Sequence, residues 1–224
     1  VFTSDNGPVL GGEGGACLAR YNGPFRGQKN YVLEGGLRVP ALAHWPAGLP
    51  ANCGHHGLVH HCDWLPTLLA AAGIGAAAEL PLDGLDQLAA LRGEREPVDP
   101  ARFWQHNRYA PFPHVNAAMR DGPWKLLWDY PEAARRKLPE DNGWYRRMFR
   151  EPHFETDVDL REIRLEGVEP GPPHLYHLGD DPHEANDLAA AHPVRLAAMQ
   201  RAYDAWFAEV DAERRSRDSV WGTA

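Results

Sequence analysis

The 224-residue sequence has few cysteines, no long apolar run and no excess of positive charge. Its three cysteines, Cys17, Cys53 and Cys62, form no CxxC pair, and their odd number gives neither a disulfide framework nor a thiolate zinc site. No run of 18 apolar residues is present, so the sequence encodes no membrane-spanning helix. The 31 acidic residues outnumber the 23 basic ones, and the resulting net charge of −8 argues against a broad nucleic-acid-binding surface.

The composition is that of a globular protein, with 43% hydrophobic and 24% charged residues. In the first half, residues 2–4 are predicted to end a buried strand, and residues 5–8 to form the turn that stops it. The apolar stretch 38–46 is predicted to be a short strand, and residues 57–74 a strand followed by a helix that Asp63 caps. This order of elements is typical of the edge of an α/β domain.

The second half predicts a small α+β unit, an antiparallel sheet covered by a helix. Apolar residues recur at helical spacing from Pro193 onwards, which predicts an amphipathic C-terminal helix whose aromatic residues belong to the core. Residues 131–173 are charged and rich in proline, and are predicted to be a surface insertion. Short strands are expected at 102–106, 115–120, 124–130 and 174–178, with Asp121-Gly122-Pro123 as a hairpin turn. The two units are expected to cover residues 1–98 and 99–224.

Asp5 and Asn6 follow the first predicted strand, and Gly7 lets the backbone turn away from them. Carboxylate and amide oxygens are ligands that suit Ca²⁺ or Mg²⁺, although Asp-Asn-Gly is also ordinary turn chemistry. Arg26 and Lys29 come later, three residues apart. A lysine near a metal would hold an anionic oxygen of a substrate, whereas Lys29 taken alone also fits a solvated surface cation.

Glu34 and Arg38 flank the Gly35-Gly36 turn. Their opposite charges and their spacing predict an ion pair, and a structural role for that pair is favoured over a direct catalytic one.

Six blocks of sequence, read in order, carry a family resemblance. They are FTSDNG, FRGQKNYVLEGGLRVPALAHWP, HHCDWLPTLLAAAGI, LDG, AAMRDGPWKLL and LYHLGDDPHEANDLA. The series resembles the C-terminal half of type I sulfatases of the alkaline-phosphatase superfamily and extends over nearly the whole chain. The resemblance implies the C-terminal part of an alkaline-phosphatase-like α/β domain, followed by a small α+β subdomain with an antiparallel sheet and a C-terminal helix.

The same resemblance implies roles for the polar residues near the start. It implies Asp5 and Asn6 as Ca²⁺ ligands and Lys29 as a catalytic residue that contacts the sulfate, with Arg26 as a further substrate-binding residue. Phosphodiesterase and phosphonate-hydrolase relatives tend to have histidine at the place of Asn6. Since a histidine nitrogen favours zinc or manganese and an amide oxygen favours calcium, Asn6 argues for the sulfatase branch.

Sulfatases use a formylglycine nucleophile made within a Cys/Ser-x-Pro/Ala-x-Arg element, and no cysteine or serine of this sequence lies in one. The family's remaining metal ligands, its other active-site lysine and its histidines precede the Asp-Asn strand. We therefore expect the chain to be a C-terminal fragment of a longer enzyme, inactive by itself, whose residues 1–75 expose apolar surface when alone.

Further substrate contacts are predicted from the mixed aromatic and polar stretch 102–114. The candidates are Trp104, His106, Asn107 and Arg108, although a lone histidine such as His106 is more often a structural residue. The basic and aromatic segment 134–151 is expected to be a solvated insertion, with a lip that grips a sulfated sugar as the alternative.

The sequence thus predicts a Ca²⁺-dependent hydrolase of sulfate monoesters whose partner is a small-molecule or carbohydrate sulfate ester. Aryl and carbohydrate sulfates remain open, as does the oligomeric state. The alternatives are a phosphate or phosphonate ester hydrolase of the same superfamily and a non-catalytic remnant or binding module. The resemblance also implies a periplasmic or secreted protein.

Overall fold

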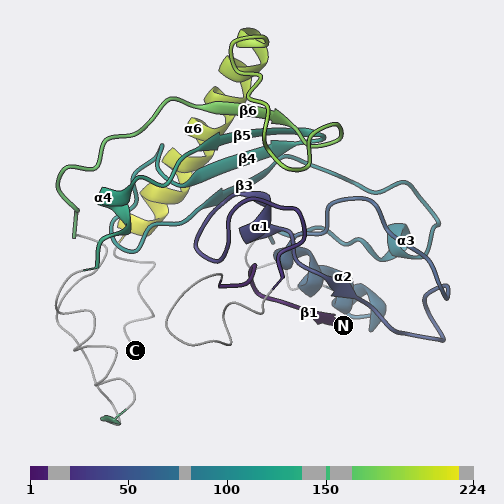
Figure 1. The fold of residues 1–224 in the computed structure, drawn as a ribbon. Helices are drawn as coiled ribbons and strands as arrows, with labels where there is room; N and C mark the ends of the chain where they lie inside the picture. Colours follow the sequence, from purple (N-terminus) through teal and green to yellow (C-terminus); the bar gives the residue numbers. More distant parts are fainter. Residues whose placement is uncertain (10–20, 76–81, 138–149, 152–162, 217–224) are drawn as a thin grey trace.

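The computed structural model describes residues 1–9, 21–75, 82–137, 150–151 and 163–216 (Figure 1). The first half of the chain contains β1 (Phe2–Thr3), α1 (Glu34–Leu37), β2 (Ala41–Leu42), the 3₁₀ helix η1 (His61–Asp63), α2 (Trp64–Ala71) and α3 (Leu88–Leu91). The second half contains β3 (Arg102–Gln105), β4 (Ala117–Asp121), β5 (Trp124–Trp128), α4 (Glu132–Arg135), β6 (His174–His177) and α6 (Pro193–Arg215).

The second half is built on one antiparallel sheet with the strand order β3-β4-β5-β6. Strands β4 and β5 form the hairpin that the sequence predicts, because Asp121 pairs with Trp124 across Gly122-Pro123. Gly122 has φ of 55°, a conformation that glycine adopts without a steric penalty. Helix α6 crosses one face of this sheet (Figure 1). The α+β unit predicted from the sequence is therefore confirmed.

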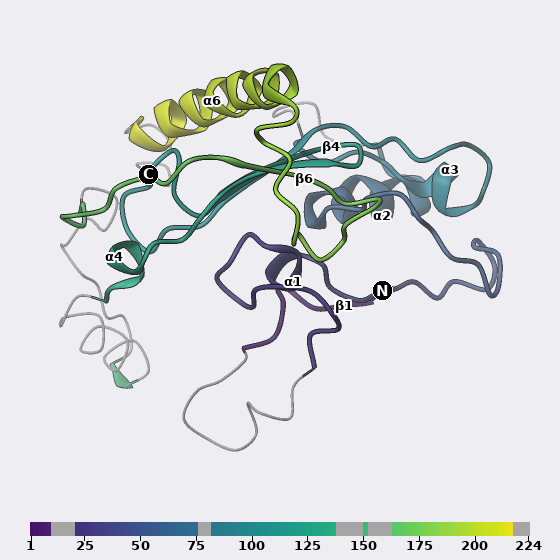
Figure 2. The same cartoon turned by 45° about the horizontal axis from the view of Figure 1, so that its top comes forward.

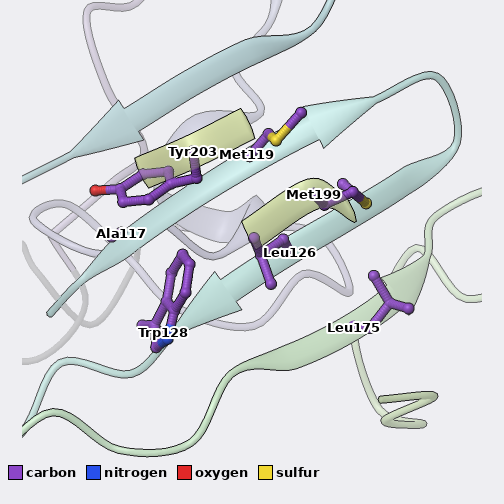
Figure 3. Close-up of a cluster of buried hydrophobic side chains, with 7 residues drawn as sticks. All are labelled: Ala117, Met119, Leu126, Trp128, Leu175, Met199 and Tyr203. Atoms are coloured by element: carbon purple, nitrogen blue, oxygen red, sulfur yellow. The ribbon is translucent and has the colours of Figure 1, made fainter. Parts of the chain in front are cut away.

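Side chains alternate between the two faces of the sheet, and both faces are buried. On the face toward α6, Met199 and Tyr203 of the helix pack among the inward residues of the strands (Figure 3). Those strand residues are Ala117, Met119, Leu126, Trp128 and Leu175. The aromatic residues of α6 therefore belong to the core, as their helical spacing predicts.

The opposite face of the sheet is covered by the first half of the chain. Its strand residues Ala118, Leu127 and Tyr176 form a cluster with Val32, and Leu33 and Leu37 pack against that cluster. Figure 2 shows the resulting layers, with α6 on one side of the sheet and α1 on the other. Because alternate strand residues point to opposite faces, the strands present a second apolar face, and α1 and the loop before it pack against that face.

The first strand is shorter and more exposed than the sequence suggests. Phe2 and Thr3 pair antiparallel with Leu42 and Ala41, so that β2 occupies only two residues of the predicted strand 38–46. Phe2 and Leu42 are both 66% exposed, because the described chain offers no sheet to cover them. The expectation of a buried strand at 2–4 is wrong for this chain, whereas the expected apolar surface of residues 1–75 is present.

The segment 57–74 contains helices but no strand. The residues before η1 pair with no strand, and α2 covers Trp64–Ala71. Asp63 is the N-cap residue of α2 by position, but its side chain bonds elsewhere: Oδ2 accepts from the backbone N–H of His60. Gly73, with φ of 69°, follows the last turn as predicted.

Both ends of the predicted insertion 131–173 belong to the folded unit. Ala134 of α4 and Val168 are buried together with Val115, the residue two before β4. The central part of that insertion, with the proposed aromatic lip, lies outside the described residues.

No helix in the described parts of the chain combines the length and the apolarity needed to cross a bilayer.

Candidate active site

The end of strand β1 is held against helix α1 by a contact between glycines. The backbone N–H of Gly7 donates to the carbonyl oxygen of Gly36 at 2.9 Å. A Cβ at Gly7 would overlap the Gly35 carbonyl group and would come within 2.9 Å of the Gly36 Cα. Only glycine permits this approach, which fixes the position of Asp5 and Asn6 relative to the Gly35-Gly36 turn.

A second backbone contact brings Lys29 to the same place. Its N–H donates to the carbonyl oxygen of Pro8 at 3.0 Å. Asp5, Asn6, Lys29 and Arg38 line one cavity of about 730 Å³. Three residues that the sequence singles out for metal and sulfate binding therefore share a cavity, although they come from two loops.

The oxygen atoms of Asp5 and Asn6 are available at this cavity. The Asn6 side-chain nitrogen donates to the Gly7 carbonyl oxygen at 2.8 Å, which fixes the amide and leaves its oxygen unbonded within the described chain. Asp5 is exposed, and its carboxylate has no ion-pair partner there. Two hard oxygen donors fit part of a Ca²⁺ shell, which takes six to eight oxygens. Among the described residues no three His, Cys, Asp or Glu side chains group to hold a metal, so Asp5 and Asn6 by themselves do not form a complete metal site.

Arg38 enters the cavity as one member of the predicted ion pair. Its Nε donates to Glu34 Oε2 at 2.8 Å. Glu34 Oε1 in turn accepts from Lys125 Nζ at 2.8 Å, and Lys125 Nζ lies 2.7 Å from Glu184 Oε1. Burial by itself raises the pKa of the Glu34 carboxyl, but Lys125 and Arg38 outweigh burial and hold this pKa below its ordinary value. Glu34 is thus an ionised carboxylate at neutral pH.

Three comparisons with known proteins agree on the family. Residues 1–74 match the sequence model of the family described as Sulfatase. The N-acetylgalactosamine-6-sulfatase of Canis lupus familiaris is 29% identical over 203 residues, which are 89% of this chain and 35% of the relative. Arylsulfatase A of Homo sapiens is 31% identical over 212 residues, which are 90% of this chain and 36% of the relative.

The solved structures give the same result. One from a study of the metabolism of multiple glycosaminoglycans by Bacteroides thetaiotaomicron superposes with a TM-score of 0.60 at 25% identity, over 91% of this chain and 37% of that chain. This chain belongs to the sulfatase family. It spans about a third of the length of these relatives, and its mixed helices and antiparallel sheets are those of the C-terminal region of the sulfatase α/β fold.

The substrate-binding candidates of the second half do not line the cavity of this sulfatase chain. Trp104 packs against the buried cluster under the sheet and lies 5.5 Å, between ring centroids, from His60. His106 lies 6.2 Å from the Tyr130 ring. The Asn107 side chain is used within its own turn, where Oδ1 accepts from the N–H of Phe112 at 2.8 Å. No contact in the described residues supports a substrate role for these three, and Arg108, which is exposed, is likewise not part of the cavity lining.

The Arg26 side chain bonds to a residue outside the cavity lining. Its Nη1 donates to the backbone carbonyl oxygen of Glu184, and it is not among the lining residues. Of the basic residues near the Asp-Asn turn, Lys29 and Arg38 face the cavity instead. The spacing of Arg38 from Glu34 predicts their ion pair and hence a structural role for Arg38. That spacing does not indicate where the other two guanidinium nitrogens point.

A second cavity, of about 590 Å³, lies between the start of α6 and strand β4. Its lining is mainly apolar, with Asp121, His192 and Arg195 as its charged or titratable residues. The Arg195 guanidinium already lies over the Trp124 ring, 4.9 Å from its centroid. Of these two cavities, the one at the end of β1 holds the Asp5-Asn6 turn together with Lys29 and Arg38.

Proposed function

We propose that the complete protein carrying this chain is a sulfuric ester hydrolase that cleaves sulfate monoesters with Ca²⁺ and a formylglycine nucleophile. The observation that carries the proposal is the shared cavity of Asp5, Asn6 and Lys29, which brings a carboxylate, an amide and a lysine to one place. The family relationship of the chain supports the same reaction.

The residues of the cavity have different proposed roles in binding a sulfate group. Asp5 and Asn6 would hold Ca²⁺ through the carboxylate and the amide oxygen. When bound, the ion offsets negative charge on the sulfate oxygens. Lys29 donates hydrogen bonds to a sulfate oxygen and neutralises the charge that grows there as the ester bond breaks. The nucleophile and the remaining ligands are assigned to other parts of the protein, because the sequence holds no formylglycine element.

The apolar surface of the first half supports this division. Phe2 and Leu42 on the β1–β2 pair and Leu65 and Leu68 on α2 are more than half exposed. Exposed apolar side chains of this size mark surfaces that other parts of a protein cover. We infer that the rest of the α/β domain covers them, and that the 224-residue chain alone has no sulfatase activity.

A carbohydrate sulfate is the substrate class favoured here. One relative is named for N-acetylgalactosamine 6-sulfate and one solved structure comes from work on glycosaminoglycans. In this chain, Tyr21 and Phe25 line the cavity, and Tyr21 is 85% exposed. Aromatic rings of this kind pack against the apolar faces of sugars. The relative named arylsulfatase A keeps an aryl sulfate as the second candidate, and export from the cytoplasm stays an expectation from the resemblance.

The test is hydrolysis by the complete protein of an aryl sulfate, of N-acetylgalactosamine 6-sulfate and of an aryl phosphate, with and without a chelator. We expect sulfate release that the chelator abolishes and Ca²⁺ restores. Replacing Lys29 by alanine should lower kcat/KM by about 10²- to 10³-fold, as the loss of one charge-stabilising donor does elsewhere. Lys137→Ala is the matched control, since Lys137 is an exposed lysine that is not among the cavity-lining residues. Faster phosphate than sulfate release would favour the phosphate or phosphonate hydrolase, and no hydrolysis at all would favour a binding module.

A further inference from the structure

The guanidinium group of Arg38 is bound at its Nε and on one face, whereas its terminal nitrogens bind no described residue. Its Nε donates to Glu34 Oε2, and its guanidinium lies over the Phe25 ring, 4.9 Å from the centroid. The two terminal nitrogens, Nη1 and Nη2, have no partner among the described residues. The side chain is 41% exposed and lines the cavity. The four N–H groups of these nitrogens form a planar fork that matches an oxyanion.

The carboxylate that holds Arg38 is itself held by a buried lysine. Lys125 of β5 is 1% exposed, and its ammonium group lies between Glu34 Oε1 at 2.8 Å and Glu184 Oε1 at 2.7 Å. Glu184 also accepts from the backbone N–H of Glu34 at 2.8 Å through its other oxygen. Glu34 is therefore fixed by contacts on both its carboxylate and its backbone.

Burying the charges of Glu34, Lys125 and Glu184 costs free energy that a solvent-exposed ion pair would not require. Burying charges is unfavourable unless every one is paired, and an exposed arginine would be solvated without any of these contacts. The sheet subdomain supplies Lys125 and Glu184, whereas the cavity belongs to the first half of the chain. The buried cluster thus connects the sheet to one cation at the cavity and fixes the direction of its fork.

We propose, on the basis of the function proposed above, that Arg38 binds an oxyanion of the substrate and that Glu34 and Lys125 are positioning residues for it. The oxyanion is either the reacting sulfate or a second negative group of the substrate, such as a carboxylate on a neighbouring sugar. Both are planar or tetrahedral oxygen acceptors that a guanidinium binds through two parallel hydrogen bonds. Arg38 then adds a second cation to Lys29, and the site favours substrates with more than one negative charge.

The experiment compares the complete protein with its Arg38→Gln, Arg38→Lys, Lys125→Met and Lys125→Arg variants. Two substrates separate the sources of the oxyanion, an aryl sulfate with one anionic group and a sulfated sugar with an added carboxylate. Binding of inorganic sulfate, measured by calorimetry, gives a readout that needs no turnover. Arg92→Gln is the matched control, because Arg92 also stacks on an aromatic ring, that of Trp45, and bonds through Nε to a backbone carbonyl but does not line the cavity.

We expect Arg38→Gln to lower kcat/KM by about 10- to 100-fold, the loss typical of a hydrogen bond to a charged group, while Arg92→Gln changes nothing. A loss on both substrates together with weaker sulfate binding assigns Arg38 to the reacting sulfate. A loss confined to the doubly charged sugar assigns it to the second group. Arg38→Lys should recover only part of the loss, because lysine keeps the charge but not the fork.

The positioning role is tested by a double-mutant cycle. Lys125→Met should raise KM on the same substrate that Arg38→Gln affects, and Lys125→Arg, which keeps the charge but displaces the buried Glu34 carboxylate, should raise KM less. The double variant Arg38→Gln/Lys125→Met should lose no more substrate affinity than Arg38→Gln alone, because both changes remove one interaction. If Lys125→Met is too unstable to purify, the comparison of Lys125→Arg with wild type still tests whether displacement of the cluster changes KM.

Unchanged kcat/KM on both substrates and unchanged sulfate affinity in Arg38→Gln would overturn the inference while leaving the proposed sulfatase activity standing. A different result would refute the proposed function and leave the inference on Arg38 standing. A wild-type protein that hydrolyses no sulfate ester but binds sulfate in an Arg38-dependent way would refute the proposed function and support the role of Arg38.

Discussion

Asp63 and Arg102 form a buried ion pair between the two halves of the chain. Arg102 Nη2 lies 2.5 Å from Asp63 Oδ1, and the side chains are 8% and 0% exposed. Asp63 comes from η1 and Arg102 from β3, and the same carboxylate accepts the N–H groups of His60 and Leu85 at 2.8 Å each. This pair therefore fixes the helices of the first half against the first strand of the sheet.

Replacing Arg102 by methionine should destabilise the protein strongly. The change leaves the Asp63 carboxylate buried with two backbone N–H groups and the Cys62 thiol at 4.0 Å as its partners. Losing the charged member of a buried pair typically costs about 3–5 kcal/mol. Urea denaturation of the complete protein, followed by fluorescence, measures the loss. The control is Arg215→Gln, which breaks the pair between the exposed Arg215 and Asp211 on α6 and should cost less than about 1 kcal/mol. Equal effects of the two changes would contradict a structural role for the Asp63–Arg102 pair.

Gly7→Ala should disturb both the fold and the site. The new Cβ would overlap the backbone of Gly35 and Gly36, which no side-chain rotation can relieve. We expect a stability loss of about 1–3 kcal/mol, as for other overpacked positions, together with weaker metal binding because Asp5 and Asn6 move with the turn. Gly171→Ala is the control, since no atom lies within 4 Å of the added carbon there. Retention of full stability and metal affinity in Gly7→Ala would show that the glycine contact does not fix the turn.

The elements that the sequence predicts well are those with local signals. Helix α6 begins at Pro193 as its apolar period requires, and the β4–β5 hairpin follows from Asp121-Gly122-Pro123. Of the strand predicted at 38–46, only two residues form β2. The length of a strand depends on its hydrogen-bonding partner, and only Phe2 and Thr3 of β1 pair with it. Propensity alone cannot supply that partner.

The candidate site was only partly predictable for a similar reason. Asp5, Asn6 and Lys29 lie in recognisable blocks, and the structure places them at one cavity, although their roles as ligands stay predictions. Lys125 gave no signal, because the strand alternation of WKLLW places it on a face but cannot show which groups meet it. Its partner Glu34 is 91 residues away in the chain.

Asn6→His should change the metal preference of the complete protein. An imidazole nitrogen in place of an amide oxygen favours zinc or manganese over calcium. We expect calorimetric titration of the metal-free protein to show weaker Ca²⁺ binding and stronger Zn²⁺ binding in the variant than in wild type. The control Asn52→His alters an exposed asparagine outside the cavity lining and should change neither affinity. An unchanged Ca²⁺ affinity in Asn6→His would exclude Asn6 as a ligand.

The His60 ring should make the stability of the fold depend on pH. His60 is half-buried beside η1, where Nδ1 lies 3.0 Å from Cys62 Sγ and the backbone N–H of Cys62 donates to the same nitrogen. Burial, and next the nearby Arg102 guanidinium, lowers the pKa of His60 below its ordinary value of 6.5. At slightly acidic pH the unfolded chain therefore binds a proton at His60 that the folded chain does not.

Because the unfolded state binds more protons there, the free energy of unfolding should decrease as the pH falls below 6.5 and stop decreasing once the folded-state pKa is passed. His60→Gln keeps an acceptor near the Cys62 N–H but cannot take up a proton, so this part of the pH dependence should vanish. Urea denaturation of both proteins between neutral pH and pH 5 measures the difference in slope. The same slope in the two proteins would show that protonation of His60 does not oppose folding, and that the contact with Cys62 tolerates the charged ring.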